Sequence, residues 1–278
     1  HWFSKAGLWF GLAFLYVPIV SMIVFSFNNS RLVTVWDAPN SPTLRWYGEL
    51  FRNEQILGAA WLSIRIAAMS ATGAVVLGTL AGLVLARFGP FRGRALLSGM
   101  TTAPLVMPEV ITGLSLLLLF VSLEQLIGWP AMRDAATITI AHITFSMAYV
   151  TIVVQSRLAG FDNSLEEAAL DLGARPAKVF FRITLPLIVP AIMSGWLLAF
   201  TLSWDDVVVS QFVAGPGSTT LPMVIFSKVR LGVSPDVNAL ATIMVLIVAT
   251  GVVASAFWMR RQERRREREM QMAAAANK

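Results

Sequence analysis

Four residues of this sequence have side chains that suit the binding of a cation within a membrane. Glu109 lies mid-way along an apolar stretch, just after Pro104 and Pro108, while Trp204, Asp205 and Asp206 stand at the end of another. Charged side chains in membrane spans are costly and usually face a pathway or a bundle interior. Adjacent carboxylates attract cations, and an indole ring can add a cation–π contact. Our hypothesis is that these residues line a translocation route. The alternatives are a salt bridge or helix-end contact for Glu109 and helix-end solvation for the two aspartates.

Few other residues suit chemistry. The chain has no cysteine, which excludes disulfides, Cys-ligated zinc, iron–sulfur clusters and thiol nucleophiles. Its two histidines, His1 and His142, are too few for a histidine-based metal centre, and no Ser/His/Asp set is recognisable beyond His142. Motifs for nucleotide phosphates or for hydrolases are absent. We predict no catalytic residue, no bound metal and no cofactor, and we interpret His142 as a hydrogen-bonding residue between helices.

The composition indicates a membrane protein. The 278 residues are 56% hydrophobic and 14% charged, whereas soluble domains carry about 45–50% apolar and about 25% charged residues. The net charge of +6 raises the possibility of a nucleic-acid partner. The basic residues flank apolar stretches on one side, however, where membrane topology and anionic lipid account for them. The expected surrounding is therefore a lipid bilayer, with no nucleic acid.

Six apolar stretches are long enough to cross a bilayer, which takes about 20 helical residues. They are Gly7–Phe27, Ile56–Ala86, Ala95–Leu123, Ala135–Gln155, Ile183–Trp204 and Ala239–Met259. Most Lys and Arg residues fall in the N-terminal segment, the second and fourth loops and the C-terminal tail. The positive-inside rule places this set in the cytoplasm. The sequence thus predicts an all-α, multi-pass protein of six transmembrane helices with both termini cytoplasmic.

The fourth loop contains two short predicted helices. Ser164 and Glu167 have the spacing of a capping box, and Gly173 is well placed to end the helix that follows. Pro176 suits the first turn of a second helix, which would continue into the fifth span. We expect both helices to lie at right angles to the membrane helices. The small Ala168 and Ala169 would allow another protein's backbone to approach closely.

The same loop resembles that of a known family. Glu167-Ala168-Ala169, then Gly173 and Ile183-x-Leu185-Pro186, match the EAA loop of binding-protein-dependent ABC importers. In that family the loop is the coupling helix that docks on the ATP-hydrolysing subunit. The resemblance implies a type I ABC importer permease fold and a coupling role for one set of residues, Glu166, Glu167, Ala168, Ala169, Asp171 and Gly173. It also implies the domain division: first helix and periplasmic loop (1–55), transmembrane core (56–259) with coupling loop (157–182), and basic cytoplasmic tail (260–278).

Further segments resemble the polyamine branch of these permeases, most of all the second permease subunit of putrescine uptake systems. They include Arg45–Leu50, Ala103–Val110 and Gly195–Thr201. The resemblance implies a bacterial inner membrane location, a sister permease, a dimer of ATPase subunits that binds ATP and Mg, and a periplasmic polyamine-binding protein. Putrescine and spermidine both remain possible substrates, and a homodimer remains an alternative to the heterodimer.

Two other functions stay open at this point. A self-sufficient cation channel or an ion-coupled carrier would need no ATPase, and carriers often show inverted repeats or broken spans in matched positions. No repeat is visible here, and such a protein would have no use for the ordered fourth loop. A membrane scaffold without transport is the third possibility, and the acids in and near the spans weigh against it.

Overall fold

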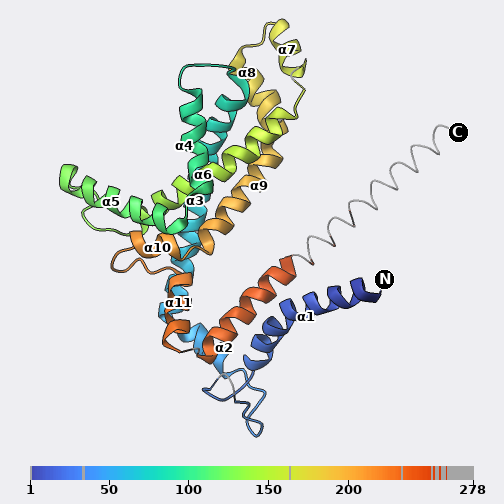
Figure 1. Cartoon of the computed structure of the whole chain (residues 1–278), viewed down its shortest axis with the longest axis vertical. Helices are drawn as coiled ribbons and strands as arrows, with labels where there is room; N and C mark the ends of the chain where they lie inside the picture. Colours follow the sequence, from blue (N-terminus) through green and yellow to red (C-terminus); the bar gives the residue numbers. More distant parts are fainter. Residues whose placement is uncertain are drawn as a thin grey trace, which may run out of the picture. The chain divides into compact units, whose positions relative to one another are not determined.

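The computed structural model describes residues 2–32, 35–162, 164–232 and 234–251, together with 253, 257 and 261. Within these residues the secondary structure is entirely helical, as the sequence predicts. The chain forms two compact units (Figure 1). One comprises Gln55–Ser227, and the other combines the residues up to Glu54 with those from Lys228 onward.

The terminal unit contains α1 (Trp2–Phe25), α2 (Arg45–Arg52) and an apolar helix over Pro235–Gly251. The loop between α1 and α2 is organised by Asn28, which is buried. The Asn28 side-chain oxygen accepts a hydrogen bond from the Asp37 backbone (2.9 Å), and its carbonyl accepts one from the Trp46 indole (2.6 Å). The sixth predicted span extends beyond this helix into residues that are only partly described. The predicted tail 260–278 lies outside the described residues except for Arg261.

The larger unit contains the remaining helices, apart from the first residue of α3 and the last residues of α11, which belong to the terminal unit. These helices are α3 (Glu54–Arg87), α4 (Arg94–Val106), α5 (Glu109–Ile127), α6 (Ala135–Ala159), α7 (Ser164–Asp171), α8 (Pro176–Val179), a π-helix (Phe180–Thr184), α9 (Leu185–Trp204), α10 (Val208–Val213) and α11 (Leu221–Leu231). Across the described residues, five helices are long and apolar enough to span a membrane: Trp2–Phe25, Glu54–Arg87, Glu109–Ile127, Ala135–Ala159 and Pro176–Trp204.

The prediction of a single helix over Ala95–Leu123 was wrong, because the stretch is broken between α4 and α5. Pro108 has no N–H to donate to the preceding turn. The residue before a proline is also pushed out of the helical region, and Met107 has an extended conformation with φ −79° and ψ 133°. The sequence therefore places Glu109 at the first residue of a new helix, rather than mid-way along one.

The helices α3 and α6 pack closely because α3 presents glycines to α6. A Cβ atom added at Gly78 would lie 2.7 Å from the Cβ of Val150 and 2.8 Å from the carbonyl oxygen of Met147. On the same interface, the hydroxyl of Ser70 donates to the carbonyl of Thr139 (3.3 Å). The helix α9 lies alongside α6 (Figure 1), and both contribute to a buried apolar core. This framework positions the loop after α6 and the break after α9.

Candidate functional site

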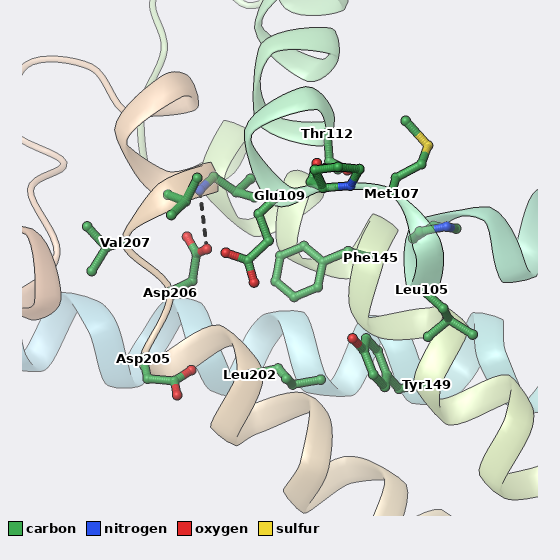
Figure 2. A pocket seen from close by; sticks show the side chains of 14 residues that line it. Leu105, Met107, Glu109, Thr112, Phe145, Tyr149, Leu202, Asp205, Asp206 and Val207 are labelled. Carbon is green, nitrogen blue, oxygen red and sulfur yellow. Dashed lines mark hydrogen bonds between the residues drawn. The ribbon is translucent and has the colours of Figure 1, made fainter.

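A cavity of about 490 Å³ lies in the larger unit, where α4, α5, α6, α9 and α10 converge. Figure 2 shows acidic and aromatic side chains around it. Among its lining residues are three of the four that the sequence singled out, namely Glu109, Asp205 and Asp206. The structure thus brings together acids that are almost a hundred residues apart in the chain, and it leaves out Trp204.

Two interrupted helices meet at this cavity. One break separates α4 from α5 at Met107 and Pro108, and the other separates α9 from α10 at Asp205–Val207. The last carbonyl groups of a helix lack partners within it and carry partial negative charge. The ends of α4 and α9 therefore bring partial negative charge to the cavity, while the starts of α5 and α10, at the same breaks, bring partial positive charge. Broken membrane helices supply ion and substrate sites in other transporters for the same reason.

Glu109 and Asp205 are both exposed. The carboxylate of Glu109 projects into the cavity toward the side on which Asp206 and Phe145 lie (Figure 2). Asp205 directly follows Trp204, the last residue of α9, as the C-cap of that helix. These two acids can bind a cation through charge-assisted hydrogen bonds, which are about twice as strong as neutral ones.

Asp206 has a different environment, since its side chain is only 6% exposed. Its carboxylate accepts hydrogen bonds from the backbone N–H groups of Ser210 (2.7 Å) and Val209 (3.2 Å), in the first turn of α10. The Nε2 atom of His142 lies 3.2 Å from the same carboxylate. Asp206 therefore caps a helix start as well as lining the cavity.

His142 is fully buried and joins three helices. Its Nδ1 lies 2.6 Å from the hydroxyl of Ser203 on α9, and its Nε2 lies 3.1 Å from the hydroxyl of Ser210 on α10. The interpretation of His142 as a hydrogen-bonding residue between helices is confirmed. The inference that the chain has no Ser/His/Asp set was wrong in one respect. A serine, a histidine and an aspartate do lie together, because His142 contacts Ser203 through Nδ1 and Asp206 through Nε2. Ser203 is also buried, and neither it nor His142 lines the cavity.

The aromatic residues of the cavity come from α6 rather than from α9. Trp204 stacks on Phe200 with ring centroids 6.2 Å apart and planes at 10°, whereas Phe145 and Tyr149 line the cavity. Sequence reasoning missed Phe145. The spacing of His142, Phe145 and Tyr149 at i, i+3 and i+7 places them on one face of a helix, and this signal could have grouped them.

The helix α7 ends as the sequence predicts. Gly173 has a φ of +79°, which favours glycine. Its N–H donates to the carbonyl of Leu170 (2.8 Å), and that of Ala174 donates to Ala169 (3.1 Å). This pair of bonds is a Schellman motif, and it closes the helix C-terminus.

The start of α7 and the course of α8 differ from expectation. Ser164 is the first helical residue, and its N–H donates to the carboxylate of Asp162 (2.9 Å) rather than to Glu167. Hydrogen bonds from the backbone N–H and the side chain of Ser164 lower the pKa of Asp162 below its ordinary value. Pro176 does begin α8. This helix continues through the π-helix into α9, as the sequence predicts. The expectation that both short helices lie at right angles to the membrane helices was therefore wrong for α8, and only α7 is a separate short helix.

Glu166 lies on the side of α7 that faces the rest of the unit. Its carboxylate accepts a hydrogen bond from the hydroxyl of Thr184 (2.7 Å) and pairs with Arg87 at the end of α3 (3.3 Å). By contrast, Glu167, Ala168 and Asp171 are exposed. The helix therefore has an inner face that ties it to α3 and the π-helix, and an outer face that is available to a partner.

Removing the inner contact is expected to loosen α7. Because hydrogen bonds to charged groups contribute about 1.5–3 kcal/mol, we expect Glu166→Ala to destabilise the protein by that amount. Glu124→Ala, at an exposed position of α5, should change stability by about 0.5 kcal/mol or less. Thermal unfolding of the purified proteins in detergent measures the difference. Equal unfolding midpoints for the two variants would show that the Glu166 contacts do not hold α7.

A family model decides what kind of protein carries these features. Residues 74–268 match the family described as "Binding-protein-dependent transport system inner membrane component". The chain belongs to this family. The match includes the cavity and the loop with α7, so both are features of a multi-pass transport permease. Membership confirms the resemblance seen in the EAA segment.

Curated relatives cover most of the chain. The putrescine transport system permease protein PotI of Escherichia coli K12 is 57% identical over 265 residues, which are 95% of this chain and 92% of PotI. The spermidine/putrescine transport system permease protein PotC of the same strain is 44% identical over 87% of this chain and 88% of PotC. The resemblance to the polyamine branch of the family is therefore confirmed.

Solved structures confirm the fold. A bacterial ABC transporter involved in the import of the acidic polysaccharide alginate has a chain that aligns with a TM-score of 0.70 at 16% identity, over 91% of this chain and 94% of that one. The MetNI methionine ABC transporter in its inward-facing conformation aligns with a TM-score of 0.56 at 16% identity, over 72% of this chain and 92% of that one. The fold is that of a type I ABC importer permease.

Proposed function

We propose that this chain is a permease subunit of an ATP-driven polyamine importer in the bacterial inner membrane. The observation that carries the proposal is the 57% identity to PotI over 95% of the chain. The acidic cavity supports it independently, since a polyamine carries two or more positive charges. Putrescine is the substrate that we favour, because identity to PotI exceeds identity to the spermidine/putrescine permease PotC.

The cavity suits an alkyl diammonium ion in two ways. Glu109 and Asp205 can accept hydrogen bonds from ammonium groups, each worth about 1.5–3 kcal/mol. The rings of Phe145 and Tyr149 can contact the methylene chain and attract its cationic ends. The chain would form one half of the translocation pathway, and a sister permease would supply the other half.

Energy would enter through α7. The exposed face with Glu167, Ala168 and Asp171 would dock on an ATPase subunit, and ATP and Mg would bind to that partner rather than to this chain. Movement of α7 would pass to α3 through Arg87 and to α9 through Thr184, because Glu166 contacts both. A periplasmic polyamine-binding protein would then release its substrate into the opened cavity.

Uptake by the purified complex tests the proposal. The complex is isolated through a tag on this chain, reconstituted in liposomes and supplied with its binding protein, ATP and labelled putrescine. We expect accumulation that requires both ATP and the binding protein. Accumulation without ATP would instead support a channel or an ion-coupled carrier, and no accumulation would overturn polyamine import.

A further inference from the structure

The three acids at the cavity differ in their hydrogen bonds. Glu109 and Asp205 are exposed, whereas the carboxylate of Asp206 accepts from two backbone N–H groups and contacts a buried histidine. A carboxylate is acceptor-only and offers about four lone-pair sites. The contacts with Ser210, Val209 and His142 use most of that capacity. Asp206 thus has little left for a cation in the cavity.

The contact with His142 connects Asp206 to the packed interior. The imidazole is fully buried on α6, and its ring is fixed at both nitrogens, by Ser203 on one side and by Asp206 and Ser210 on the other. Since a carboxylate only accepts, the Nε2–H group of His142 donates to Asp206. A buried network of this kind fixes one geometry when all its members are bonded. In this protein the network fixes the conformation of the segment between α9 and α10, which also contains Asp205.

We propose that His142 is a positioning residue for the cation site. It holds Asp206 at the start of α10, so that Asp206 shapes the cavity wall while Asp205 and Glu109 bind the substrate's ammonium groups. The inference rests on the proposed function for the identity of the cation. The division of roles among the three acids is new, and it removes Asp206 from the substrate-binding set that the sequence predicts.

Amide substitutions separate a role in charge from a role in geometry. In Asp206→Asn, the amide oxygen can occupy the place of Oδ2 and keep the bonds to Ser210 and His142, while the amide NH2 group replaces Oδ1, loses the 3.2 Å bond from Val209 and faces that N–H group. In Asp206→Ala all of these bonds are lost. At His142, glutamine keeps a donor for Asp206, whereas alanine does not. Asp205→Asn removes a charge without disturbing this network.

The experiment measures putrescine uptake by the reconstituted complex for these variants. We expect Asp205→Asn to raise KM about tenfold or more, as loss of one charge-assisted hydrogen bond implies. We expect Asp206→Asn and His142→Gln to stay within about threefold of the original KM, and Asp206→Ala and His142→Ala to raise it and to show no further effect when combined. A KM for Asp206→Asn that rises as far as that for Asp205→Asn would overturn the proposal.

Thermal unfolding of the same complexes keeps the inference testable if no putrescine enters. The absence of putrescine uptake would show that putrescine is not the substrate, and the role of His142 would then be tested by stability alone. We then expect Asp206→Ala and His142→Ala to lower the unfolding midpoint by similar, non-additive amounts, with Asp206→Asn close to the original protein. Midpoints unchanged in both alanine variants would contradict the positioning role.

Discussion

The double substitution Glu109→Gln/Asp205→Asn is expected to raise the KM for putrescine uptake at least about 100-fold, if each lost charge-assisted hydrogen bond costs about 1.5–3 kcal/mol. Both side chains are exposed and line one cavity, at the ends of two interrupted helices. The amides keep the size of the original side chains and remove the negative charge. The effect should therefore fall on binding, and assembly of the complex should remain intact.

Uptake of labelled putrescine over a range of concentrations measures this effect. The matched control is Glu124→Gln, which removes an exposed carboxylate from α5 at a position that does not line the cavity. We expect this variant to transport as the original protein does. Equal KM values for the control and the double variant would show that the cavity acids do not bind the substrate.

The second large effect is expected at Gly78. Even alanine there would place its Cβ 2.7 Å from that of Val150 and 2.8 Å from the carbonyl oxygen of Met147. Because the backbone of α6 cannot move aside easily, we expect Gly78→Ala to destabilise the protein by about 1–3 kcal/mol or more through overpacking. Gly78→Leu should prevent accumulation of folded protein in the membrane.

Gly58 provides the matched control, since it lies on the same helix and a Cβ added there meets nothing within 4 Å. Alanine is favoured over glycine within helices by about 1 kcal/mol, so Gly58→Ala should be neutral or stabilising. Thermal unfolding in detergent compares the two single alanine variants. A Gly78→Ala protein as stable as Gly58→Ala would contradict the close packing of α3 and α6.

Features encoded by local signals were predictable from the sequence. Gly173 indicated the end of α7 because a positive φ favours glycine, and Pro176 indicated the start of α8 because proline suits the first helical turn. The long helices were predictable from the apolar stretches, because the length and hydropathy that a membrane span requires are properties of a single segment.

Features that depend on contacts between segments were not predictable. Nothing in the sequence around Asp206 shows that His142, from another helix, lies 3.2 Å from its carboxylate. Asp205 has the same sequence neighbours as Asp206, yet Asp205 is exposed. The local sequence therefore does not distinguish the two aspartates. The break at Met107 could have been inferred, since Pro108 follows it, but apolar composition alone favoured one continuous span.

Co-purification tests the central claim most directly, namely that this chain works as a coupled subunit of an ATP-driven importer. The chain is tagged, native membranes are solubilised gently, and the retained proteins are identified. We predict that an ATPase and a sister permease are retained, and that Glu167→Arg on the exposed face of α7 loses the ATPase while Glu124→Arg on α5 keeps it. A chain that is recovered alone in every case would contradict this account.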